Sequence, residues 1–192
     1  MQNKQIILAS ASPRRKELLE LMGLTFQIIP STKEEVITGS SPAEIVENLS
    51  YQKAEDVFSQ MAAGDILVIG SDTIVVCDGE AMGKPHSEEE AFAMLYRLQG
   101  RSHEVYTGVT VICREDNKIK RDTFSKMATV KVHSMSAEEI RAYIAKGESM
   151  DKAGAYGIQG SFAVFVDEIQ GEYNTVLGLP VAGLYQSLKK FL

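Results

Sequence analysis

The sequence opens with an apolar run that is followed at once by a capped helix, and this pattern sets the fold class. Residues 6–9 have the length and composition of a buried strand, and residues 10–12 are small enough for a tight turn. Ser12 is a favourable N-cap, Pro13 suits the first helical position, and Gly23 is typical of a helix stop. Strands and helices alternate along the rest of the chain, which predicts an α/β fold with a mixed sheet.

Two arginines stand in the first turn of that predicted helix. Arg14 and Arg15 lie beside free backbone N–H groups and the positive end of the helix dipole, where anions are favoured and cations are repelled. A bound polyanion would explain them, because phosphate accepts hydrogen bonds from a helix N-terminus and from guanidinium groups. A capped helix with two solvated arginines is the structural alternative, and the spacing alone leaves the two interpretations even.

Length, composition and charge limit the classes of function. The chain has 192 residues, of which 44% are hydrophobic, and a formal net charge of −6. We expect one domain over residues 1–192, because this length can bury a substantial core. The acidic balance argues against a nucleic-acid partner. The apolar runs are too short to span a membrane and no signal peptide is evident, so we expect a cytoplasmic protein without a membrane partner.

A carboxylate follows a second buried strand. The apolar run at residues 66–69 predicts a strand covered on both faces, and Asp72 stands just beyond it in Gly70-Ser71-Asp72-Thr73. In open α/β sheets, ligands collect at the carboxyl ends of strands. A charge there is costly unless it is paired or binds a metal. An Asx-turn that caps the strand is the structural alternative.

The other expected elements follow from turn and capping signals. Asp78-Gly79 predicts a tight hairpin, and residues 24–29 predict a second strand. Gly83-Lys84-Pro85 presents a lysine on a rigid turn, and Lys53 lies inside a predicted helix, where a solvated lysine is the simpler interpretation. Three further helices are expected to begin after serine N-caps, at Ser41, Ser87 and Ser136.

Four segments taken together resemble the signature segments of the Maf family of nucleoside triphosphate pyrophosphatases. They are Ser10-Ala11-Ser12-Pro13-Arg14-Arg15, Gly70-Ser71-Asp72-Thr73, Gly83-Lys84-Pro85 and the loop DKAGAYGIQG at residues 151–160. The resemblance implies an α/β fold with an elongated central mixed sheet, flanking helices and two lobes around a cleft, similar to the inosine triphosphate pyrophosphatases. It also implies a homodimer.

The resemblance implies an activity as well. The family uses a divalent cation, Mg²⁺ or Mn²⁺, to cleave the α–β phosphoanhydride of a nucleoside triphosphate, and the products are the monophosphate and pyrophosphate. The residues that distinguish its branches are Arg14, Thr73 and Gln159 here, and this set resembles the branch that acts on dTTP and UTP rather than the 7-methyl-GTP branch.

The family's functional residues match named positions of this chain. Asp72 matches the proton acceptor, and Lys53 and Lys84 are expected to join it in catalysis. Glu34 and Asp72 are the expected metal ligands. The residues expected to bind the phosphates are Ser10, Arg14, Arg15, Lys53 and Lys84.

Two alternatives stay open at this point. Modified pyrimidine triphosphates could be the substrates instead of dTTP and UTP. The chain could also be a nucleotide-binding regulator of cell division or septum formation that does not depend on turnover. Asp72 distinguishes this second alternative from an enzyme, because a pure binder has little use for an anion beside a polyanionic ligand, whereas a metal-assisted hydrolase requires one.

Overall fold

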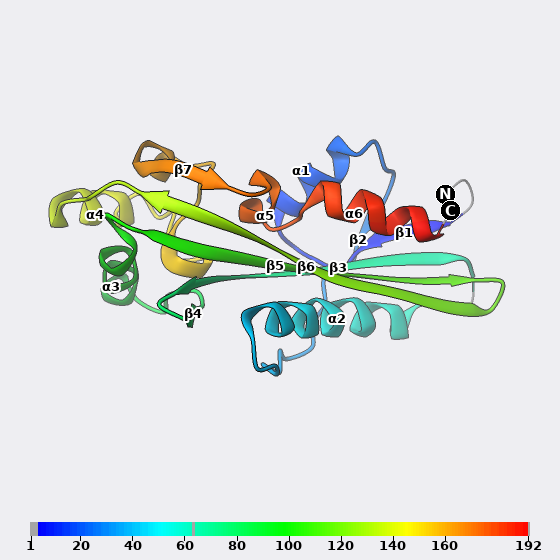
Figure 1. Ribbon diagram of the computed structural model, residues 1–192. Coiled ribbons are helices and arrows are strands. Elements are labelled where there is room, and N and C mark those ends of the chain that lie inside the picture. The colour runs from blue at the N-terminus through cyan, green and yellow to red at the C-terminus, as the bar shows by residue number, and fades with distance from the viewer. Residues whose placement is uncertain (1–3, 63, 192) are drawn as a thin grey trace. The chain divides into compact units, whose positions relative to one another are not determined.

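The computed structural model describes residues 4–62 and 64–191, and within them seven strands form one mixed sheet (Figure 1). The strands are β1 (Gln5–Leu8), β2 (Gln27–Ile28), β3 (Ile66–Cys77), β4 (Glu80–Met82), β5 (Ser102–Glu115), β6 (Lys118–Val132) and β7 (Val166–Gln170). Their order is β2-β1-β3-β5-β6-β7, and β4 pairs with β3 outside this order. β1 is parallel to β2 and to β3, whereas the β3–β4 and β6–β7 pairs are antiparallel. The expected α/β class with a mixed sheet is confirmed.

Helices occupy much of the remaining chain. The α-helices are α1 (Pro13–Leu21), α2 (Pro42–Gln60), α3 (Glu88–Leu98), α4 (Ala137–Ile144), α5 (Tyr173–Leu177) and α6 (Val181–Leu188). Short 3₁₀ helices lie at η1 (Ala153–Ala155), η2 (Ser161–Phe165) and η3 (Lys189–Phe191). Contacts within the chain divide it into two compact units. Unit 1 comprises Met1–Asp72, Thr107–Lys126 and Gly178–Leu192, and unit 2 comprises Thr73–Tyr106 and Met127–Leu177.

In unit 1, α2 packs closely on one face of the sheet, and Figure 1 shows α1 and α6 on the other face. Two glycines make the approach of α2 possible. A methyl group at Gly70 of β3 would collide with the backbone of Ser50, and one at Gly108 of β5 would collide with the backbone of Val46. The buried apolar residues on this side are Ile7, Ala9, Ala54, Val57, Phe58, Ile66, Val68 and Ile112. Burial of such side chains stabilises the packed layers by ~1.5–3 kcal/mol for each large one.

Unit 2 has a core of its own, rich in aromatic rings. The Phe162 ring centroid lies 4.6 Å from that of Tyr156 and 5.2 Å from that of Tyr143. The Tyr143 hydroxyl accepts a hydrogen bond from the Gly157 N–H at 3.1 Å, and Tyr156 Oη lies 2.7 Å from Nε2 of His103. Residues 154–158 are buried as a result, so these aromatic residues anchor the glycine-rich loop.

The local signals in the sequence located most helix starts correctly. Ser12, Ser41, Ser87 and Ser136 each accept a hydrogen bond from the backbone N–H three residues later. The expected Asp78-Gly79 turn joins β3 to β4. The strand expected at residues 24–29 is shorter, because β2 pairs with β1 only at the last two residues of β1.

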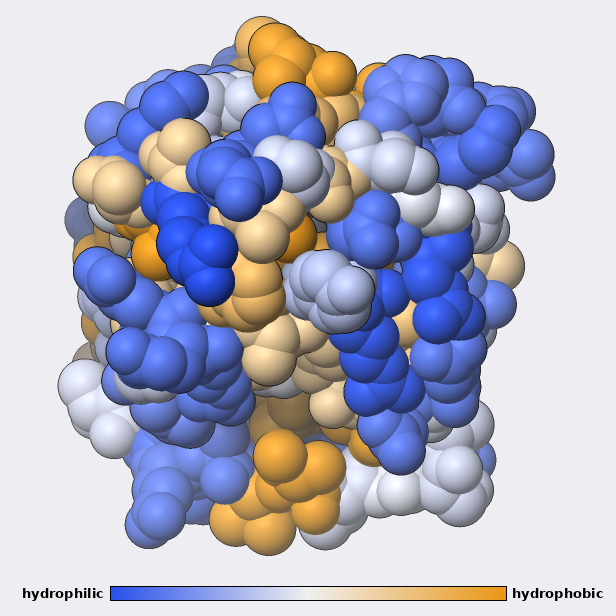
Figure 2. All heavy atoms as spheres, turned by 90° about the vertical axis from the view of Figure 1, so that its left-hand side faces the viewer, coloured by the Kyte–Doolittle hydropathy of each residue, from blue (hydrophilic) through white to orange (hydrophobic). Residues whose placement is uncertain are grey.

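The face of the molecule in Figure 2 is largely polar. Hydrophilic residues predominate on that face, and hydrophobic residues are exposed there in separate patches. Among the helices of the described residues, none combines the length and the apolar character needed to cross a bilayer.

Candidate active site

Asp72 lies inside a strand. The sequence pattern predicts a position just beyond a strand's end, and the structure corrects this. β3 continues through this residue to Cys77, so Asp72 is not part of an Asx-turn. The pairing of β1 with β3 stops at Leu8 and Ile69, and β4 pairs with β3 only from Val75 onward. Asp72 therefore lies just beyond the carboxyl end of the parallel β1–β3 pair, which is where the rule for ligand sites places functional residues.

Lys53 is paired with two carboxylates. Its ammonium nitrogen lies 2.5 Å from Oδ1 of Asp72 and 2.9 Å from Oε1 of Glu35. The Lys53 side chain is 17% exposed and that of Asp72 is 11% exposed. Charged groups shielded from water in this way interact more strongly than surface ion pairs do. Lys53 is therefore not the solvated helix lysine that the simpler interpretation of the sequence assumed.

Glu35 is the carboxylate of this loop that contacts Lys53, whereas the sequence analysis had selected Glu34. Glu34 is exposed, and its side chain makes no ion pair with a described residue. The two residues are adjacent in an irregular loop, so no periodic pattern in the sequence distinguishes them. The sequence offers both glutamates as candidate carboxylates, and only the family resemblance favours Glu34.

Arg15 makes hydrogen bonds that hold parts of the fold together, and it also belongs to the candidate site. Its Nε donates to the carbonyl oxygen of Gly178 at 2.8 Å, and its guanidinium donates to Ser10 Oγ at 3.1 Å. Burial lowers the pKa of Arg15, and the negative charge of Asp72 opposes that shift. Arg14 is half-buried beside it. Ser10, Arg15, Lys53 and Asp72 are thus brought together within unit 1.

Ser71 helps to hold this arrangement, although the sequence analysis gave it no role. Its hydroxyl is fully buried and lies 2.8 Å from the carbonyl oxygen of Gly178 and 3.0 Å from that of Gly108. The Gly178 carbonyl oxygen therefore has both Arg15 and Ser71 within hydrogen-bonding distance. Alternation along β3 directs the side chains of Ser71 and Asp72 to opposite faces of the sheet.

The remaining predicted residues lie in unit 2. Thr73 follows Asp72 in β3 and is half-buried, whereas Lys84 and Gln159 are exposed. The Gly154 N–H donates to the carbonyl oxygen of Gly83 at 3.0 Å, so the turn that carries Lys84 is joined to the loop that carries Gln159. The Gln159 side chain makes no hydrogen bond with any described residue, which leaves its amide available to a ligand.

The glycines of the 151–160 loop accommodate the protein's own side chains. A methyl group at Gly157 would lie 2.6 Å from Cε of Lys152, whose ammonium donates to the carbonyl oxygen of Glu148 and to the carboxylate of Asp151. At Gly160 a methyl group would collide with the carboxylate of Glu148. The space beside both glycines is therefore filled by side chains of the same chain.

Two carboxylates of the site could coordinate a divalent cation. Among the described residues, no cluster of three or more His, Cys, Asp or Glu side chains has metal-binding geometry. Asp72 and Glu35 nonetheless converge on one positive charge, that of Lys53. Mg²⁺ is commonly held by one or two carboxylates together with substrate phosphates, and this pair of oxygen donors fits that pattern.

Two comparisons of sequence agree on one family. The family described as Maf-like protein matches residues 5–191. A protein of Agathobacter rectalis named dTTP/UTP pyrophosphatase is 48% identical, over 97% of each chain. A Bacillus thuringiensis protein of the same name is 49% identical, over 98% of this chain and 96% of its own. A crystal structure of a nucleoside-triphosphatase / dITP/XTP pyrophosphatase from Mycobacterium abscessus is a more distant match. The match covers 68% of this chain and 75% of that chain, with 12% identity and a TM-score of 0.44.

Proposed function

Since the chain belongs to the Maf-like protein family, we propose that it is a nucleoside triphosphate pyrophosphatase that hydrolyses dTTP and UTP to the monophosphate and pyrophosphate. The observation that carries the proposal is the ion pair of Lys53 with Asp72 and Glu35, whose carboxylates also interact electrostatically with Arg15 of α1. This arrangement combines carboxylates, which can accept a proton or coordinate a metal, with cations, which can bind phosphate. The name shared by relatives at 48–49% identity supports the choice of dTTP and UTP.

In the proposed reaction a water molecule attacks the α-phosphorus while Asp72 accepts its proton. The bond from the α-phosphorus to the oxygen that bridges it to the β-phosphorus breaks, and pyrophosphate leaves with that electron pair. Lys53 holds the Asp72 carboxylate in place through their 2.5 Å contact. Positive groups near the leaving phosphates stabilise the charge that develops on them. We assign this role to Arg14, because the hydrogen bonds to Gly178 and Ser10 are made by Arg15.

A divalent cation completes the proposed site. Asp72 and Glu35 are the residues that would hold it, and Glu35 replaces Glu34 in this proposal because of its contact with Lys53. When bound, Mg²⁺ or Mn²⁺ would neutralise part of the polyphosphate charge. For Lys84, Thr73 and Gln159 the roles in phosphate binding and specificity stay predictions, as do a single functional domain over residues 1–192, a homodimer, a cytoplasmic location and the lack of a nucleic-acid partner.

Product analysis tests the proposal directly. The protein is incubated with Mg²⁺ and each of dTTP, UTP, dCTP, dATP, GTP and 7-methyl-GTP, and the products are separated by anion-exchange chromatography. We expect dTMP and UMP with one equivalent of pyrophosphate, formed faster than the products from purine nucleotides. Release of orthophosphate and a nucleoside diphosphate would contradict the proposed bond. Tight binding of dTTP without turnover would favour the regulatory alternative.

A further inference from the structure

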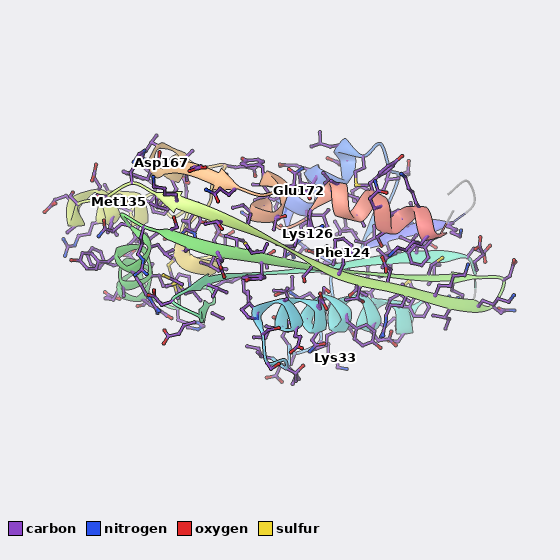
Figure 3. The ribbon with its side chains drawn as sticks, in the orientation of Figure 1. Lys33, Phe124, Lys126, Met135, Asp167 and Glu172 are labelled. Atoms are coloured by element: carbon purple, nitrogen blue, oxygen red, sulfur yellow. The ribbon has the colours of Figure 1, made fainter. Side chains whose placement is uncertain are left out.

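A row of four polar side chains on α2 holds the loop of residues 31–40. The row, here called the α2 ladder, consists of Glu44, Asn48, Gln52 and Asp56. Residues four apart lie on the same face of a helix, so the ladder forms one stripe along α2. The loop and the ladder both belong to unit 1. Figure 3 shows Lys33, near the start of the loop, on the side of α2 that faces away from the sheet.

Each rung of the ladder contacts the loop in order, so that the loop runs antiparallel to the helix. Asp56 accepts hydrogen bonds from the hydroxyl of Ser31 and from the next two backbone N–H groups, at 2.7–3.3 Å. Asn48 donates to the carbonyl oxygen of Thr38 at 3.0 Å. Glu44 accepts from the backbone N–H of Ser40 at 2.8 Å.

Gln52 makes the most specific of these contacts. Its Oε1 accepts from the Val36 N–H at 2.9 Å, and its Nε2 donates to the carbonyl oxygen of Val36 at 2.7 Å. The side-chain amide therefore satisfies both backbone groups of a single residue. Because both groups of one residue must be matched, this contact selects one register of the loop against the helix.

The loop has few other restraints near this position. Residues 32–40 are exposed and lie outside helices and strands. Val36 is 58% exposed and Ile37 is 72% exposed, so hydrophobic burial does not fix the loop here. A segment without regular structure or buried side chains depends on its side-chain hydrogen bonds for order.

The register set by Gln52 determines which carboxylate reaches the candidate site. Glu35 precedes Val36 in the loop, and Lys53 follows Gln52 in the helix, so two neighbouring pairs form side by side: Gln52 with Val36, and Lys53 with Glu35. We propose that Gln52 is a positioning residue, which holds Val36 so that Glu35, and not Glu34, reaches Lys53. This inference rests on the proposed function, in which Glu35 would help to hold the divalent cation.

Loss of the Gln52 amide should release the loop without disturbing the core. Gln52→Ala removes both contacts with Val36, while the apolar residues between α2 and the sheet are unchanged. Displacement of a functional group by about 1 Å can reduce a rate by up to ~100-fold. We expect Gln52→Ala to lower kcat for dTTP by roughly 10- to 100-fold. Gln60→Ala is the matched control, because within the described residues the Gln60 side chain hydrogen-bonds to Asp56 of its own helix and to no residue of the loop.

The experiment compares five proteins: the wild type, Gln52→Ala, Glu35→Ala, the double variant and Gln60→Ala. It measures kcat for dTTP with Mg²⁺, and hydrogen–deuterium exchange of residues 31–40 without nucleotide. The proposal expects faster exchange at Val36 in Gln52→Ala and wild-type exchange in Gln60→Ala. It also expects non-additivity: once Glu35 is absent, the further change Gln52→Ala alters kcat by less than ~2-fold, since Gln52 acts through Glu35.

The outcomes separate this inference from the proposed function. If Glu35→Ala is impaired but Gln52→Ala keeps wild-type turnover or wild-type exchange, the positioning role is wrong and the proposed function stands. If Gln52→Ala lowers kcat by the same factor in the wild type and in the Glu35→Ala variant, the positioning role of Gln52 is wrong as well. If the wild type does not hydrolyse dTTP, or if Glu35→Ala is fully active, the proposed role of Glu35 fails and the inference fails with it.

Discussion

The ammonium of Lys53 lies 2.5 Å from a carboxylate oxygen of Asp72, and this contact depends on a residue without a side chain. α2 carries Lys53, and β3 carries Asp72 together with Gly70. The backbone of Ser50 occupies the space that a side chain at Gly70 would need. The close packing of α2 on β3 thus brings Lys53 next to Asp72.

Gly70→Ala should therefore lower both stability and activity. The added methyl group meets backbone atoms of α2, which cannot move aside as a flexible side chain would, and overpacking of this kind costs ~1–3 kcal/mol. Urea unfolding measures the loss. Gly83→Ala is the stability control, because nothing lies within 4 Å of a methyl group there. Equal stability of both variants would show that α2 does not depend on Gly70.

The two arginines of α1 should respond differently to substitution. Arg14→Ala should impair dTTP hydrolysis and leave the thermal midpoint close to that of the wild type. Arg15→Ala should lower both, because it removes the hydrogen bonds to Gly178 and Ser10. Arg15→Lys should also be impaired, since an ammonium cannot reproduce the guanidinium geometry. Kinetics and thermal melts of the three variants provide the test, and indistinguishable melts for the two alanine variants would contradict the structural role of Arg15.

Gln159→Glu should weaken dTTP and UTP hydrolysis more than hydrolysis of 7-methyl-GTP. The Gln159 amide can pair with the N3–H and an adjacent carbonyl group of uracil or thymine, whereas a carboxylate offers acceptors alone. An unpaired polar group costs ~1–3 kcal/mol, so kcat/KM should fall by roughly tenfold to a hundredfold. The measurement is kcat/KM for each nucleotide in both proteins. An equal loss on every nucleotide would mean that Gln159 recognises no base.

His103 should make the folded state less stable in mild acid. Burial lowers the pKa of His103 from 6.5 to about 4. Above pH ~6.5 the residue is neutral in both the folded and the unfolded chain; as the pH falls from there toward 4, only the unfolded chain gains the proton, so the free energy of unfolding decreases by up to ~3 kcal/mol. His103→Gln, which does not titrate, should show a smaller decrease between pH 6.5 and 4.5 in urea unfolding. The same decrease in both proteins would assign the effect to other groups.

Local chemistry in the sequence was enough to predict most helix starts. Ser12 and Pro13 determine the start of α1 through hydrogen bonds and dihedral angles within one turn, which need no tertiary information. The role of Asp72 stays a prediction, and its expected position at a strand end is corrected, because β3 continues through it. Its true setting depends on where β1 and β4 stop pairing with β3, and residues far from Asp72 in the sequence decide that.

The choice between Glu34 and Glu35 could not be made locally. In our proposal it depends on Gln52, which is 16 residues from Val36 in the sequence and hydrogen-bonds to it. The role of the glycines at 157 and 160 could not be predicted from the sequence either. The side chains beside them, those of Lys152 and Glu148, come close only in the folded loop.

The most direct test of the account is the kcat of Asp72→Asn for dTTP with Mg²⁺, measured beside the wild type and Asp65→Asn. Asp65 is exposed just before β3 and controls for the loss of one carboxylate from this part of the chain. The substitution at Asp72 retains size and hydrogen bonding but removes the base, so we predict a loss of at least ~100-fold with a folded protein in thermal melts, and wild-type turnover in Asp65→Asn. Full release of dTMP and pyrophosphate by a folded Asp72→Asn protein would contradict the account.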